Sequence, residues 1–146
     1  MNDATTATGL RGLLSGLRSN GDRRRPADVF RGLSPRDLLN ALDNERRRLV
    51  IVHMDAPDYQ GIDLGELATR LAAYEQDTDR ECIRAQARKR VYIALYQAHL
   101  PVLLDCDIIR ETEYGLYLKG VNFGQAAGLL ADAYRFAGVE MPEVPA

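Results

Sequence analysis

The sequence predicts a mostly α-helical fold with one small β-hairpin, an extra C-terminal helix and an N-terminal appendage, an α+β class. Helix-capping residues stand before several segments whose apolar residues recur at helical spacing. Two short strand-like runs flank Gly115. The length of 146 residues favours one domain over two full cores.

The N-terminal segment is expected to be a helical or disordered appendage that becomes ordered only on a partner or against the domain. Three glycines interrupt its helical pattern. Its basic end precedes Pro26 and should be exposed, either as an arm that follows a phosphate backbone or as an inert solvated linker. The leucines that share one helical face are Leu10, Leu13, Leu14 and Leu17, and the basic end is Arg23, Arg24 and Arg25.

Capping residues predict the first two helices of the domain. Ser34 and the proline after it indicate a helix that ends near Leu42. Asp43 or Asn44 is expected to cap the next helix, over about residues 45–53.

Two further helices should follow a loop. Asp63 is expected to cap a helix of about residues 64–75, with Glu66 as its reciprocal partner in a capping box. A long helix should run from about residue 81 to 104, bent or interrupted at Pro101, which lacks a backbone N–H donor.

The last part of the chain predicts a hairpin and a helix. The runs 108–112 and 116–118 are joined through Gly115, which supplies the positive φ of a tight turn. Asn122 is expected to cap a helix that Gly138 ends.

Three helices followed at once by a hairpin form the layout of a winged helix-turn-helix, in which the helix before the hairpin enters a major groove. Four segments extend this likeness: residues 42–48 (LDNERRR), 62–68 (IDLGELA), 72–75 (AAYE) and 88–101 (RKRVYIALYQAHLP). With them, the chain resembles a haloarchaeal winged-helix family of unassigned function, similar in layout to ArsR-like regulators. The resemblance covers about residues 34–119 and is most specific over residues 88–101.

The resemblance implies a winged helix-turn-helix and, by analogy, a DNA-binding transcription regulator; it brings no catalytic residue, metal site or ligand. Glu111 and Glu113 at the hairpin tip depart from a DNA-reading wing, because acidic side chains repel phosphate. The expected divisions are the appendage (1–27), the winged helix-turn-helix domain (28–120), the C-terminal helix (121–138) and a tail (139–146).

The long helix carries the candidate DNA-binding surface. On an ideal helix, residues 87, 91, 94, 95 and 98 gather on a core face, and the opposite side is polar. Arginine suits guanine, glutamine suits adenine, and an apolar side chain can meet a thymine methyl group. The alternative is an ordinary solvated face with Tyr92 and Tyr96 half-buried. The candidate DNA-binding residues are Arg84, Gln86, Arg88, Lys89, Arg90, Ile93 and Gln97, of which Arg84 and Arg88 would hold phosphates.

A second basic cluster, Arg46 to Arg48, has two interpretations. Arg46 and Arg47 are possible phosphate contacts, as are the three arginines of the appendage. Three consecutive residues fan out around a helix, however, so ion pairs with nearby acidic residues are the favoured alternative.

The C-terminal helix is the candidate dimer interface. Glycine and alanine along it permit close helix approach, and a two-fold dimer would match two half-sites about one helical turn apart. Alternatively, the helix covers the open face of its own domain. The candidate interface residues are Phe123, Ala127, Leu130, Ala131 and Tyr134.

Composition excludes several other classes. The chain holds two cysteines, too few for a disulfide scaffold, and neither they nor the two histidines stand at zinc-binding spacing. We therefore expect no metal, no cofactor and no enzyme activity, since no serine lies near a histidine at catalytic spacing and no phosphate-binding loop is present. Without a signal-peptide pattern or a membrane-spanning run, a cytoplasmic protein is expected.

Charge distribution leaves two functions open. The net charge is −2, with an excess of acidic residues after residue 48, so any contact with DNA must use local clusters. Double-stranded DNA is the first expected partner, bound by a homodimer. The alternative is a winged-helix protein–protein interaction module, which the acidic hairpin favours.

Overall fold

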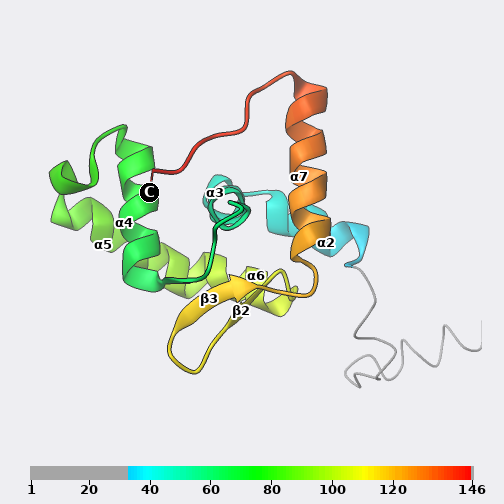
Figure 1. Ribbon diagram of the computed structural model, residues 1–146, viewed down its shortest axis with the longest axis horizontal. Helices are drawn as coiled ribbons and strands as arrows, with labels where there is room; N and C mark the ends of the chain where they lie inside the picture. Colours follow the sequence, from blue (N-terminus) through cyan, green and yellow to red (C-terminus); the bar gives the residue numbers. More distant parts are fainter. Residues whose placement is uncertain (1–32, 146) are drawn as a thin grey trace, which may run out of the picture. The chain divides into compact units, whose positions relative to one another are not determined.

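Figure 1 shows the order of the elements in the computed structural model, which describes residues 33–145. The predictions for the appendage, including its three arginines, lie outside the described residues. The elements are α2 (Pro35–Leu42), α3 (Glu45–Met54), β1 (Ile62–Asp63), α4 (Leu64–Gln76), the 3₁₀ turn η2 (Arg80–Cys82), α5 (Ala85–Ala94), the π-helical η3 (Leu95–His99), α6 (Leu100–Asp105), β2 (Ile109–Glu111), β3 (Leu116–Lys119) and α7 (Phe123–Ala137). The predicted class, mostly helical with a small antiparallel sheet in a winged-helix-like layout, is confirmed.

Side-chain caps start α2, α3 and α4 where the sequence predicts them. The Ser34 hydroxyl accepts a hydrogen bond from the N–H of Asp37 at 3.1 Å. Asn44 Oδ1 accepts from Arg46 N–H at 2.9 Å, and Asp63 Oδ1 accepts from Glu66 N–H at 2.9 Å. Each cap satisfies a backbone donor that the first helical turn leaves free.

The predicted long helix is corrected in two ways. It begins at Ala85, after η2, and five π-helical residues separate α5 from α6. The π turn ends two residues before Pro101, whose ring would crowd the carbonyl four residues earlier in a regular α-helix. This wider turn shifts the buried face to His99 and Leu100, so Ala98, predicted on the core face, is exposed.

The hairpin belongs to a three-stranded antiparallel sheet with strand order β1-β3-β2. Ile62 lies opposite Tyr117, and Ile109 lies opposite Lys119. Gly115 makes the turn with a φ of +77°, as predicted. The β1–β3 pairing is a feature that the sequence does not predict, because β1 has only two residues.

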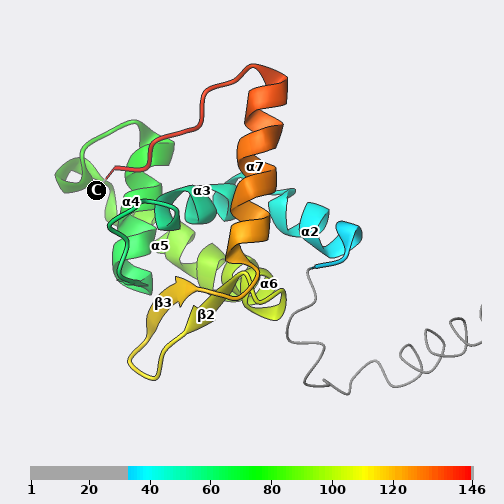
Figure 2. The same cartoon turned by 45° about the vertical axis from the view of Figure 1, so that its right-hand side comes forward.

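The core lies between α3, α4, the α5–α6 segment and the sheet, and α7 covers α3. Figures 1 and 2 both show α7 and α2 on the opposite side of α3 from α4 and α5. Leu49, Ile51, Leu67, Leu71 and Leu95 are fully buried there. Among residues 33–145, no helix has the length and apolar character to cross a membrane.

The last helix ends as predicted but begins differently. Gly138 ends α7 in the left-handed region, with a φ of +69°. Asn122 stands at the N-cap position without capping the helix through its side chain. Its Nδ2 instead donates to the carbonyl of Cys106 at 3.0 Å, because the chain folds back over the end of α6 at this point.

Candidate nucleic-acid interface

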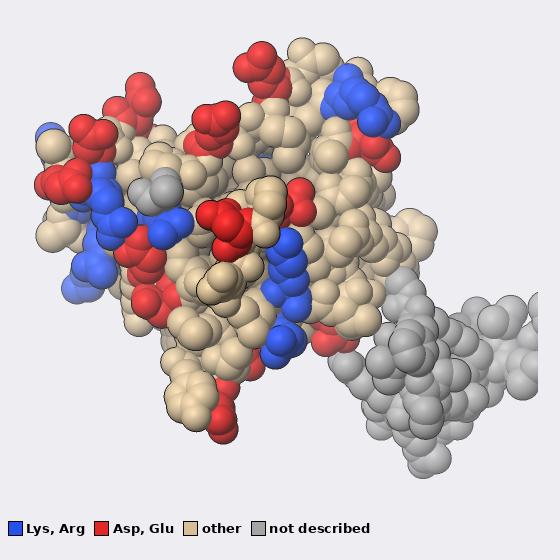
Figure 3. Space-filling view, in the orientation of Figure 1, with Lys and Arg blue, Asp and Glu red and all other residues tan. Residues whose placement is uncertain are grey.

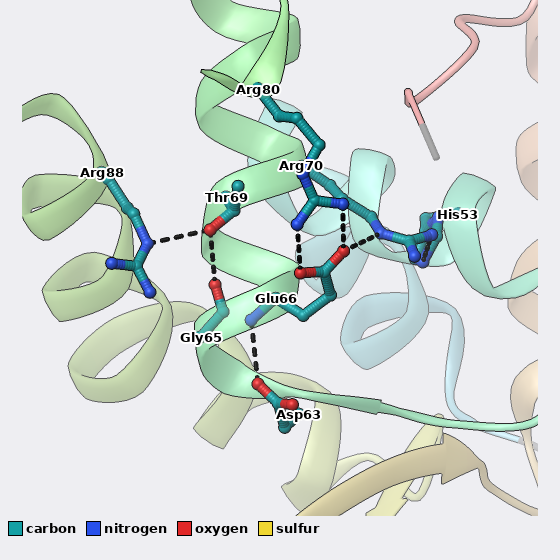
Figure 4. Close-up of polar contacts among 8 residues, drawn as sticks. All are labelled: His53, Asp63, Gly65, Glu66, Thr69, Arg70, Arg80 and Arg88. Carbon is teal, nitrogen blue, oxygen red and sulfur yellow. Dashed lines mark hydrogen bonds and ion pairs between the residues drawn. The ribbon is translucent and has the colours of Figure 1, made fainter. Parts of the chain in front are cut away.

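Helices α4 and α5 are joined by a connection that contains η2 and stand where the winged-helix-like layout has its helix-turn-helix. Glu66 on α4 holds this turn, since its carboxylate accepts two hydrogen bonds from Arg80, at 2.8 and 2.7 Å (Figure 4). Arg70 Nε donates to the same carboxylate at 2.9 Å. These bonds, the Arg80 pair first, lower the pKa of Glu66 below its ordinary value. The predicted return bond of the capping box, from the backbone N–H of Asp63 to the Glu66 carboxylate, is therefore wrong. The Glu66 carboxylate accepts from Arg70 and Arg80 instead.

A second contact fixes α5 against the first turn of α4. Arg88 Nε donates to the Thr69 hydroxyl at 2.8 Å, and that hydroxyl donates to the carbonyl of Gly65 at 2.9 Å (Figure 4). A Cβ on Gly65 would lie 3.3 Å from Asp63 Oδ1 and 3.5 Å from Arg88 Nη2. The small residue leaves room for the arginine to cross over α4.

Three cationic side chains at α5 have no polar partner in the part of the chain that the structure describes. Within residues 33–145, the side chains of Arg84, Lys89 and Arg90 make no hydrogen bond or ion pair with another residue. The sequence between Cys82 and Leu104 contains no acidic residue that could neutralise them. All of the candidate DNA-binding side chains are exposed: Arg84, Gln86, Arg88, Lys89, Arg90, Ile93 and Gln97.

The exposed side chains of α5 include hydrogen-bond donors that suit base edges. A ten-residue helix with unpaired arginine and glutamine side chains can donate to guanine and adenine edges. The positive end of the helix dipole lies at its start, next to Arg84, which suits a phosphate. Arg88 differs from the others, because its Nε already holds Thr69 and only its terminal nitrogens remain for a phosphate.

Two tyrosines beside this face are more exposed than the solvated-face alternative predicts. Tyr96 is 63% exposed and Tyr92 is also exposed. Burial first, and then Glu111, raise the pKa of Tyr117 on β3 to about 12. Tyr92 and Tyr96 add to this increase. The π turn explains the exposure of Tyr96, since it rotates that residue away from the position that an ideal helix assigns.

The hairpin tip is acidic and apolar. Tyr114 is 83% exposed between Glu113 and the Gly115 turn. In the face that Figure 3 shows, the hairpin at the bottom carries red and tan groups, and blue and red groups alternate beside α4 and α5 at left. No continuous band of lysine and arginine crosses this face, so its positive charge is confined to small clusters.

The Arg46–Arg48 cluster is structural. Arg46 Nε pairs with Glu75 at 2.8 Å. Arg47 donates to the carbonyls of Ala41 and Asn40 at 2.8 and 2.7 Å, which satisfies the last turn of α2. The guanidinium groups of Arg46 and Arg47 thus have partners within the domain, which favours the structural alternative over the predicted phosphate contacts.

Most of the candidate dimer residues pack inside their own domain. Phe123 and Leu130 are 4% and 2% exposed, in the core of their own domain. Ala127 and Tyr134 are half-buried against the same core, so only Ala131 is exposed. This helix therefore covers its own domain with that face, which was the alternative interpretation.

Sequence reasoning missed two exposed apolar residues, Leu39 on α2 and Phe136 on α7. Helical periodicity could have identified them, since each apolar residue falls outside the apolar stripe of its helix.

Within residues 33–145 no group of three or more histidine, cysteine or acidic side chains is arranged to hold a metal ion. Cys82 and Cys106 are free thiols.

Comparison with known proteins gives a family. No curated protein and no solved structure shows significant similarity to the chain. The sequence profile of a domain of unknown function, DUF7344, matches residues 39–114, just over half of the chain, from α2 to the hairpin tip. The chain therefore belongs to the DUF7344 family, and the match includes α4, α5 and the turn that joins them.

Proposed function

We propose that the protein is a sequence-specific DNA-binding transcription regulator that places α5 in the major groove and acts as a homodimer. The observation that carries the proposal is a group of exposed cations, Arg84 directly before α5 and Lys89 and Arg90 on it, which have no hydrogen-bond or ion-pair partner within the described part of the chain. Exposed, unpaired cations on and just before one helix are the local cluster that a protein of low net charge needs to bind a polyanion.

The resemblance to a haloarchaeal winged-helix family supports this role. Its most specific segment, residues 88–101, covers most of α5 and the π turn. An excess of arginine over lysine fits a GC-rich genome or a high-salt lineage. A transcription regulator of this kind acts in the cytoplasm, where an archaeal chromosome lies.

The acidic hairpin tip limits how the protein binds. Glu111 and Glu113 repel phosphate, so the hairpin stays off the DNA backbone and α5 carries the contact. Arg90 and Gln97 read base edges, Arg84 holds a phosphate, and Arg88 keeps α5 at its angle to α4 through Thr69.

Selection of binding sites from random duplexes, followed by fluorescence anisotropy over a salt series, tests the proposal. Arg90→Ala is expected to weaken binding to the selected duplex by about 1–3 kcal/mol, because it removes a base contact. Arg135→Ala is the matched control, since Arg135 is an exposed arginine on α7 that pairs with Asp132. Binding that is absent at low salt, or equal losses for the two variants, would count against the proposal.

A protein–protein interaction module is the second candidate, and one observation favours it. Tyr114, 83% exposed at an acidic hairpin tip, offers an aromatic anchor of the kind found at the centre of protein interfaces. This function predicts a stoichiometric protein partner that survives nuclease treatment and is lost in Tyr114→Ala but kept in Arg90→Ala. Loss of the partner after nuclease treatment would contradict it.

A further inference from the structure

An apolar groove lies open between α2 and the second half of α7. Its volume is about 950 Å³. Its apolar lining comes mainly from Leu39, Leu129, Ala133, Tyr134, Ala137 and Val139. The groove is on the opposite side of α3 from α4 and α5 (Figures 1 and 2), so it is separate from the candidate nucleic-acid interface.

Two large apolar side chains beside the groove are exposed to water. Leu39 is 60% exposed on α2. Phe136 is 85% exposed on α7, although the Arg135 guanidinium lies 5.7 Å from its ring centroid. Phe136 follows Ala133 by three residues and Leu129 by seven, which places the three along one flank of the helix. A contiguous exposed apolar surface of this kind is typical of an interaction site.

The charges that surround the groove balance one another. Arg36 and Arg48 line it together with Asp37 and Asp43, so its charged residues sum to zero. This balance gives no attraction for a polyanion or for a strongly charged protein. A second copy of the chain brings the same two arginines and two aspartates. In a two-fold contact, the arginines of one copy can face the aspartates of the other.

The second half of α7 carries both a part of the groove and an exposed aromatic ring. The same helix presents a hollow, along Ala133 and Ala137, and a projecting ring, Phe136. In a two-fold dimer the same surface patch of both copies forms the interface. That patch must therefore contain both the projecting side chain and the hollow that receives it.

We propose that the groove is the dimer interface: in a two-fold dimer, Phe136 of each copy inserts into the groove of the other. This inference rests on the homodimer of the proposed function and replaces the residues predicted from sequence, since Phe123 and Leu130 are buried in their own domain. It leaves the outward face of α5 free in both copies, as two DNA half-sites require.

Sedimentation velocity on the full chain tests the interface without DNA. The wild-type chain is expected to be a dimer, and Phe136→Glu should weaken the dimer by about 10-fold or more, because it puts a charge into an apolar contact. The matched control is Ala131→Glu, on the flank of α7 that the sequence favoured; it should leave the dimer intact. Both residues are exposed, so circular dichroism should show an unchanged fold.

A monomeric wild-type chain, or a dimer that Ala131→Glu disrupts and Phe136→Glu does not, would overturn the inference. Neither result bears on the contact between α5 and DNA, which the anisotropy experiment tests separately.

A fluorescence experiment reports on the occupant of the groove. The chain has no tryptophan, so Phe136→Trp introduces a unique reporter. Its emission should move to shorter wavelength as protein concentration rises through the dimerisation range, while Arg135→Trp stays exposed throughout. Emission at short wavelength in samples that sedimentation shows to be monomeric would mean that a segment of the same chain fills the groove, and emission at long wavelength at every concentration would mean that nothing does. Either outcome overturns the proposal.

Discussion

A buried histidine links the π turn to the arginine that holds the end of α2. His99 is 9% exposed, and its Nδ1 lies 3.5 Å from Arg47 Nη1. Burial, followed by the charge of Arg47, lowers the pKa of His99 below its ordinary 6.5. Burial, followed by Arg70, lowers the pKa of His53 in the same way. Both imidazoles therefore resist protonation in the folded chain.

This difference predicts how stability depends on pH. In the unfolded chain each histidine titrates near its ordinary pKa of 6.5, so the unfolded state takes up more protons as the pH falls. The contribution of the two histidines to stability is fully present above that pKa and is lost as the pH drops from 6.5 toward the lowered folded values.

Thermal unfolding over a pH series measures the effect. His99→Gln keeps a neutral side chain of similar reach and should make the decrease in melting temperature below pH 6.5 smaller. The same decrease in wild type and variant would show that His99 does not contribute.

At the scale of elements, the sequence predicts helix starts well because a cap is a local interaction. Ser34, Asn44 and Asp63 each bond to a backbone N–H two or three residues away. The π turn escapes prediction because periodicity assumes 100° per residue throughout, and this misplaces Ala98 and Tyr96. The β1–β3 pairing escapes because its partners are more than 50 residues apart.

Two glycines near α7 give a matched pair of element-scale predictions. A Cβ on Gly120 would lie 2.3 Å from the carbonyl oxygen of Asp107, a backbone atom that cannot move without breaking the turn before α7. Gly120→Ala is therefore expected to destabilise the protein by about 2 kcal/mol or more. Gly128, inside α7, would meet nothing within 4 Å, and Gly128→Ala should stabilise the protein by about 0.5–1 kcal/mol.

Urea unfolding of the two variants checks these opposite signs. A destabilised Gly128→Ala variant would show that another helix packs closely on this flank of α7, which would contradict the placement of the dimer interface on the other flank.

For the whole molecule, prediction from sequence depends on whether partners are near or distant in the chain. The outward face of α5 was predictable, because an exposed helix face follows from its own spacing. The role of Arg46 was not, since its partner Glu75 lies 29 residues away on α4. Leu130 illustrates the same limit: the sequence shows an apolar helix face, but only packing against α3 decides whether that face meets its own domain or a second copy.

The contacts within the domain separate three surfaces of the molecule. Glu66 and Arg88 hold α5 at a fixed angle to α4, the acidic hairpin lies beside it, and the apolar groove lies on the far side of α3. The proposed DNA contact and the proposed dimer contact therefore use separate surfaces.

Backbone-amide NMR during titration with the selected duplex tests the central claim most directly, since it reports which part of the chain contacts DNA. We predict that the largest shift changes fall on α5 (Ala85–Ala94) and its preceding turn, with small changes along α7 (Phe123–Ala137). Unchanged α5 signals, with the main changes at the hairpin tip or along α7, would contradict the account.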